Sequence, residues 1–212
     1  MEAVESHVSV RLYWDYLRAL SEVEKLNEEK KEKVMSHVKW TDKYVELLHF
    51  YSSCALCDSD GDGLKCQACG ANPVEKVIQL FSSESYNHDT LESEELRCIG
   101  AGSPMPAMVR ILPSLGVSKI NLDFQCVTGG QGLNEYLVCS HCAKSSILYH
   151  KLHHMRYLIL KQCEEQMEMI SYEEPLMSAD SVIEKCLKSF RWLNQILSEY
   201  VGTWRKIDLN AY

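Results

Sequence analysis

Two pairs of cysteines stand close together in CALCDSDGDGLKCQACG, residues 54–70. Each pair has the spacing C-x-x-C, which allows a tight turn to direct two sulfurs at one ion. Eight residues separate the two pairs. Because two such turns complete a tetrahedron, the spacing predicts one Zn²⁺ held by the four cysteines of this stretch. These are Cys54, Cys57, Cys66 and Cys69.

Glycines stand in this stretch where turns between and after the cysteine pairs need them. Gly61 and Gly63 suit a tight reversal between the pairs, and Gly70 follows the second pair, where a left-handed residue is often required. The segment resembles a short zinc ribbon. That resemblance implies a structural Zn²⁺ and does not imply an activity.

The same stretch matches the opening of a calcium-binding loop through Asp58, Asp60, Asp62 and Gly63. Such a loop needs a bidentate glutamate at its twelfth position, which here is Cys69. We therefore expect a polar turn with exposed carboxylates rather than a calcium site.

A third C-x-x-C pair, Cys139 and Cys142, lies between a predicted strand, LNEYLVC, and a predicted helix. This placement resembles the helix-end ligand pair of a treble-clef zinc site, because the N-terminus of a helix favours thiolate. Two further ligands are needed. They come either from one of the earlier pairs or from Cys98, Cys126, His150, His153 and His154. The sequence thus predicts one zinc ion and leaves a second open.

The cysteine and histidine candidates outside the C-x-x-C pairs are less strongly indicated as metal ligands than the paired cysteines. Cys126 ends the alternating strand pattern KINLDFQCV, 119–127. A tight hairpin at TGGQG, 128–132, would place Cys126 and Cys139 roughly 17 Å apart, so we interpret Cys126 as a core thiol. The three histidines lie opposite the apolar stripe of their helix, where we expect a solvated polar face.

Compartment and partners follow from cysteine use and charge. The N-terminal residues MEAVESHVSV lack the basic start and apolar stretch of a signal peptide, so we expect the nucleus or the cytoplasm. In a reducing compartment, paired cysteines more often bind metal than form disulfides. No apolar run approaches the about 18 residues of a membrane helix. The net charge of −8 disfavours broad binding to nucleic acid or to an anionic membrane.

The rest of the chain has the periodicity of amphipathic helices. Apolar residues recur at helical spacing over 4–51, as one long helix or two consecutive ones, and over 143–170 and 179–205. We expect the last two helices to form an antiparallel hairpin around 171–181. Between the metal segments, 71–81 is predicted as a short helix and 82–96 as a loop.

The last predicted helix carries a continuous apolar stripe at alternating spacings of three and four. We expect this stripe, like Cys163 on the preceding helix, to be core rather than a docking groove. Its members are Ile183, Cys186, Phe190, Leu193, Leu197, Tyr200 and Trp204.

The predicted fold class is mainly α with a small zinc-bound β region, an α+β protein. Three segments make it up: an N-terminal amphipathic helical segment, 1–52; a zinc-binding region with knuckles and a β-hairpin, 53–142; and a C-terminal helical hairpin, 143–212. We expect them to pack as one compact unit.

These features favour an intracellular zinc-stabilised interaction or scaffold protein. A transcription-associated regulator is one such protein. The chain would present its amphipathic helices to protein partners. No phosphate-binding loop, dinucleotide fingerprint or nucleophile elbow is present. A four-cysteine site is closed, whereas catalytic zinc keeps an open position. We therefore do not expect an enzyme.

Two alternatives stay open. One is a nucleic-acid-binding zinc protein, which the net charge disfavours because one Zn²⁺ on four thiolates takes it to about −10. The other is an enzyme with an open second metal site near Cys139 and Cys142, with histidine ligands. Self-association through the helices also stays open.

Overall fold

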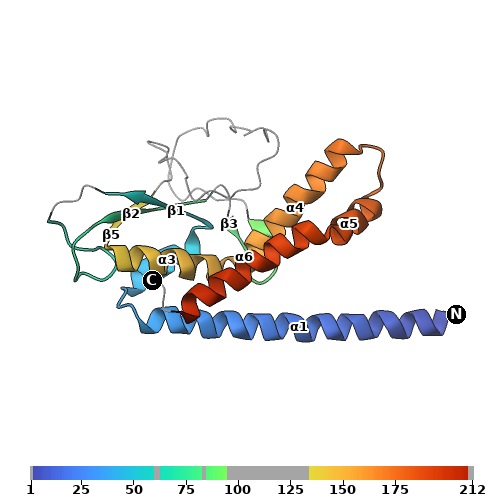
Figure 1. Ribbon diagram of the computed structural model, residues 1–212, viewed down its shortest axis with the longest axis horizontal. Coiled ribbons are helices and arrows are strands. Elements are labelled where there is room, and N and C mark those ends of the chain that lie inside the picture. Colours follow the sequence, from blue (N-terminus) through green and yellow to red (C-terminus); the bar gives the residue numbers. More distant parts are fainter. Residues whose placement is uncertain (1, 60–62, 83–84, 95–133, 210–212) are drawn as a thin grey trace.

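The computed structural model describes residues 2–59, 63–82, 85–94 and 134–209 (Figure 1). Its elements are α1 (Glu2–Ser36), α2 (Asp42–Phe50), β1 (Ser53–Asp58), β2 (Lys76–Phe81), β3 (Ser85–Tyr86), β4 (Ser93–Glu94), β5 (Asn134–Val138), α3 (Ser140–His153), α4 (Met155–Glu173), α5 (Ala179–Lys188) and α6 (Phe190–Asp208). Within these residues, six helices and a small three-stranded antiparallel sheet confirm the predicted α+β class. The predicted strand 119–127, Cys98 and Cys126 lie outside the described residues.

The three-stranded sheet has the order β1-β2-β5, with β2 antiparallel to both neighbours. The predicted helix over 71–81 is therefore wrong, since its second half is the central strand. Ile78 and Leu80 of β2 are fully buried, and strands on both sides satisfy its backbone groups. β5 confirms the strand predicted before Cys139, and its neighbour among the described residues is β2.

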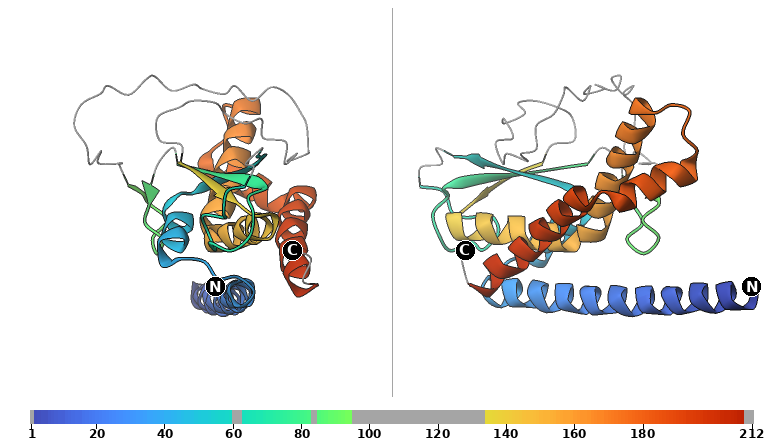
Figure 2. Two further views of the ribbon diagram at one scale, coloured as in Figure 1. Left: turned by 90° about the vertical axis from the view of Figure 1, so that its left-hand side faces the viewer. Right: turned by 45° about the vertical axis from the view of Figure 1, so that its right-hand side comes forward.

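Two consecutive helices, α1 and α2, form the N-terminal segment, with the break at 37–41. The charged run after Leu26, residues 27–33, is part of α1. Within it, Asn27 is buried: its Nδ2 donates to the carbonyl oxygen of Leu152 at 2.7 Å, and its Oδ1 accepts from Trp204 Nε1 at 3.4 Å. These bonds join the C-terminal half of α1 to α3 and α6. The N-terminal half runs on beyond the sheet (Figure 2).

Each of the two predicted C-terminal helices is divided in two. The first breaks at His154, between α3 and α4, and the second breaks at Ser189, between α5 and α6. Ser178 caps α5 by accepting a hydrogen bond from the backbone of Ser181. α5 and α6 return alongside α4, so the predicted hairpin is present (Figure 1).

The apolar stripe of α5 and α6 is only partly core. Cys186 is buried with Val182 against Ile170 of α4, but Phe190 and Leu197 are exposed. The prediction that the whole stripe is core is therefore wrong: α4 packs against α5 and α1 packs against α6, but these contacts leave Phe190 and Leu197 exposed.

One main core draws on all three predicted segments. It contains Val34 and Tyr44 from the first, Ile78 and Val138 from the second, and several residues of α3 and α6. No helix within the described ranges combines the length and the apolar character needed to cross a membrane.

Replacing Asn27 by alanine should lower the free energy of unfolding by about 1–3 kcal/mol, since the carbonyl of Leu152 loses its buried donor. Urea denaturation measures the change. The exposed Lys25, two positions earlier, provides the control, and Lys25→Ala should stay within about 0.5 kcal/mol. Equal stability of the two variants would show that Asn27 does not join the helices.

Candidate metal centre

Four cysteine sulfurs converge at the junction of β5 and α3. The Sγ atoms of Cys66, Cys69, Cys139 and Cys142 all lie within 4.8 Å of one another. A tetrahedral ion with bonds of about 2.3 Å to sulfur would hold them about 3.8 Å apart. The cluster therefore has the number, type and spacing of side chains that could bind one metal ion.

A tight turn between β1 and β2 presents the first two sulfurs. The backbone N–H of Gly70 donates to the carbonyl of Cys66 at 2.7 Å, and the φ of Gly70 is +69°, the left-handed conformation predicted for it. Gln67 fixes this turn to β5: its backbone N–H donates to the Leu137 carbonyl, and its Oε1 accepts from the Leu137 N–H, both at 2.8 Å. Cys66 and Cys69 are thereby held close to the residues that follow β5.

The start of α3 presents the other two sulfurs. Cys139 is the N-cap residue of α3, and its Sγ accepts from the N–H of Cys142 at 3.4 Å. Asn72 Nδ2 approaches the same sulfur at 3.8 Å. These donors and the positive end of the helix stabilise negative charge on sulfur. The predicted placement of this pair between a strand and a helix is confirmed.

Burial shapes the acidity of the cluster. Cys66, Cys139 and Cys142 are almost fully buried, and Cys69 is half-buried. Desolvation raises the pKa of Cys142 far above the usual value of a thiol. Desolvation also opposes ionisation of Cys69, but hydrogen bonds from the backbone of Asn72 and Ala71 and from neighbouring thiols lower its pKa to about 7. A bound cation would offset the cost of ionising the buried sulfurs.

Cys54 and Cys57 do not join this cluster. Both lie in β1, paired across the sheet with Leu80 and Val77. Positions three apart in a strand point to opposite faces, so an extended C-x-x-C cannot direct both sulfurs at one ion. Burial raises the pKa of Cys54 to about 12. The structure thus differs from the predicted set of four by joining the second pair to the third.

Two of the three aspartates of the calcium-like loop, Asp60 and Asp62, lie outside the described residues. Asp58 is exposed and forms an ion pair with Lys76 across the sheet.

The three helical histidines predicted on a solvated face are instead buried or, for His153, half-buried. His150 and His154 are buried, and their Nε2 atoms donate to the carbonyls of Tyr51 at 2.8 Å and Leu48 at 2.9 Å. These carbonyls belong to the end of α2, where the helix leaves them without intrahelical partners. The prediction was wrong because it took only the apolar stripe of the helix as covered, whereas the end of α2 packs against the side that carries the histidines.

Aromatic contacts extend this group of histidines. The ring of His153 stacks on His49, with 3.8 Å between centroids, and lies 4.8 Å from that of His88. Because Nε2 of His154 donates to a carbonyl, its Nδ1 accepts from the hydroxyl of Tyr86 at 2.5 Å. Among the described residues, no histidine belongs to a converging group of three or more metal ligands.

No protein-family model matches the chain, and no solved structure matches it.

Serine substitutions separate the two groupings of cysteines. Losing only the hydrogen-bonding partner of a metal ligand weakens metal binding about 10- to 100-fold. Cys66→Ser and Cys142→Ser each remove a ligand itself, so each should weaken binding by more than that. Cys57→Ser and Cys163→Ala should keep the full metal content, because neither residue belongs to the cluster. Elemental analysis of the purified variants measures this, and metal loss in Cys57→Ser would favour the set predicted from the sequence.

The buried histidines should make the fold sensitive to acid. Desolvation lowers the pKa of His150 to about 4, of His153 to about 2 and of His154 to about 3. Each of these pKa values is lower in the folded state than in the unfolded state. The neutral histidines therefore stabilise the fold fully above the unfolded pKa of about 6.5, and this stabilisation is lost progressively as the pH falls toward the folded pKa values. Urea unfolding free energies should therefore fall from pH 6.5 to pH 4.

His153→Gln should reduce this pH slope at unchanged metal content. His37→Gln, at an exposed site outside the histidine group, provides the control and should leave the slope unchanged. Metal should be measured at each pH, since protons also compete for thiolate ligands. An identical slope in both variants would show that His153 does not contribute.

Proposed function

We propose that this chain is a zinc-stabilised interaction protein. One Zn²⁺ would hold the small sheet on its helical scaffold, and the helices would present surfaces to protein partners. The observation that carries this proposal is the convergence of Cys66, Cys69, Cys139 and Cys142 within 4.8 Å.

The donor set favours zinc over other metals. Four soft sulfur ligands in a tetrahedral arrangement suit Zn²⁺ or iron, whereas Mg²⁺ and Ca²⁺ take oxygen ligands. Zn²⁺ has no redox chemistry of its own and is the usual ion of four-cysteine structural sites.

The arrangement supports a structural role rather than catalysis. Four protein ligands complete a tetrahedron, whereas a catalytic zinc keeps one position for water or substrate. Three of the four sulfurs are almost fully buried in the main core. The ion would bridge positions about seventy residues apart in the chain, between the turn after β1 and the start of α3, so its binding energy would be folding energy.

The remaining parts of the proposal concern compartment and partners. None of the eight cysteines of the described residues forms a disulfide, which suits a reducing compartment such as the nucleus or the cytoplasm. Large apolar side chains exposed on α5 and α6 supply a surface for a protein partner.

Metal content and metal-dependent stability test the proposal. Protein purified without added metal should contain one zinc per chain, and a strong chelator should remove it and lower Tm. Zinc should restore Tm, and Mg²⁺ should not. Co²⁺ in its place should give the intense visible absorption of a tetrahedral thiolate site.

Two outcomes would contradict the proposal. Iron in place of zinc would make the centre a candidate for electron transfer. An unchanged Tm after complete removal of the metal would show that the ion does not support the fold.

A further inference from the structure

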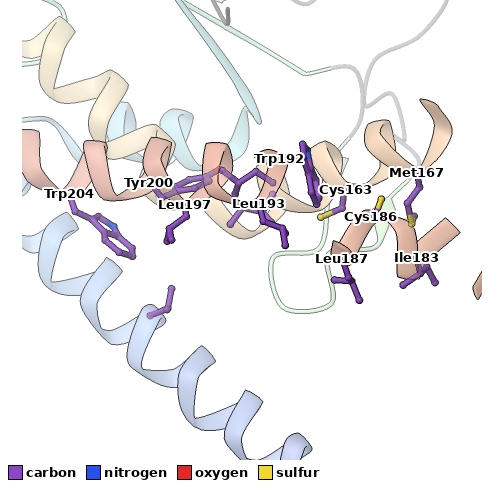
Figure 3. A pocket seen from close by; sticks show the side chains of 13 residues that line it. Cys163, Met167, Ile183, Cys186, Leu187, Trp192, Leu193, Leu197, Tyr200 and Trp204 are labelled. Atoms are coloured by element: carbon purple, nitrogen blue, oxygen red, sulfur yellow. The ribbon is translucent and has the colours of Figure 1, made fainter. Parts of the chain in front are cut away.

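Helices α5 and α6 of the C-terminal hairpin expose an apolar face beside α1. A cavity of about 420 Å³ lies there, between α1, α4, α5 and α6. Figure 3 shows Leu197 and Trp204 of α6, Ile183 and Leu187 of α5, and Met167 of α4 around it. All thirteen side chains that line the cavity are apolar, aromatic or cysteine. We call this surface the α5–α6 face.

The α5–α6 face, to which we add the exposed Phe190 at the start of α6, exposes more apolar side chain than packing inside one chain requires. The exposed fractions are 46% for Ile183, 62% for Leu187, 76% for Phe190 and 58% for Leu197. At roughly 100 Å² each, these four supply on the order of 400 Å², about half of the about 800 Å² that each partner of a standard interface buries. That share fits the apolar part of an interface with a polar rim.

Charge makes this face suited to a copy of the same chain. The whole chain carries a net charge of −8, so two copies repel over most of their surface. Residues 179–208 differ, with five basic and four acidic side chains. The lysines beside the face are already paired within the chain: Lys188 with Glu184 at 2.6 Å, and Lys185 with Glu174 at 2.5 Å.

The repeat of this face also fits a symmetric pairing. α6 continues the direction of α5 (Figure 1), and apolar residues follow a heptad through both helices. Of this heptad, Ile183, Phe190 and Leu197 are exposed, whereas Cys186 and Tyr200 are buried within the chain. The positions that flank the heptad, where coiled coils place the charges that select a partner, are uncharged from Val182 to Thr203. Identical surfaces can therefore meet about a two-fold axis without placing like charges opposite each other.

From these observations we propose that the α5–α6 face joins two copies of this chain in a symmetric dimer. The inference rests on the proposed function, because the second copy is then a protein partner of the helical surface. In the dimer, Phe190 and Leu197 of each copy are buried at the centre of the interface, and the paired charges of α5 lie at its rim.

The oligomeric state of the full-length protein, measured by sedimentation and native mass spectrometry, tests the proposal. The wild type should have twice the chain mass. Phe190→Glu and Leu197→Glu should each raise the dimer dissociation constant at least 100-fold, because a charge would be buried at the centre of the interface. Leu176→Glu is the matched control, since Leu176 is fully exposed in the α4–α5 turn and does not line the face. It should remain dimeric.

Far-UV circular dichroism and zinc content should be unchanged in all three variants, because the substituted side chains are exposed. If one glutamate variant unfolds, Leu187→Ser provides a milder substitution on the same face. A wild type that stays monomeric at every concentration, or a dimer that all face variants retain, would overturn the proposal. Zinc-bound monomers would refute the dimer and leave the zinc centre supported, whereas a metal-free wild-type dimer would refute the zinc centre alone.

Discussion

The attachment of the cysteine turn to β5 is the contact on which the rest of the structure depends. Gln67 exchanges two hydrogen bonds with Leu137, one through its backbone and one through its side chain. This contact sets Cys66 and Cys69 opposite the start of α3, where Cys139 and Cys142 stand. The sheet, the cysteine cluster and the first turn of α3 therefore form one connected unit in the main core.

Buried polar side chains connect the helices to this unit. Asn27, His150 and His154 each donate to a backbone carbonyl of another helix or its end, and all three carbonyls belong to segments around α2 and α3. Hydrogen bonds are directional, so these three fix the relative orientation of the helices as well as stabilising their packing. The small sheet alone offers little surface for this purpose. A polar interior thus accompanies the cysteine cluster in the core of the scaffold.

Local patterns in the sequence predicted the helices and β5, but not the partners of each cysteine pair. Helical periodicity is a property of neighbouring residues, and the helical part of the α+β class followed from it. The placement of 71–81 as a central strand depends on neighbours far along the chain, which local propensity does not contain. The predicted set of Cys54, Cys57, Cys66 and Cys69 differs from the cluster for a related reason, because an extended backbone at Cys54 and Cys57 separates sulfurs that a turn would bring together. The alternative that the third pair takes its partners from an earlier pair agrees with the cluster.

The double hydrogen bond between Gln67 and Leu137 also determines how β5 aligns with β2. If β5 slipped by one residue, Val138 would turn away from the core, and the first turn of α3 would move out of reach of Cys66 and Cys69. A metal ion at the cluster would therefore select one alignment of the strands over its neighbours. A bound ion would stabilise only the chain arrangement in which the two distant segments bring all four sulfurs together.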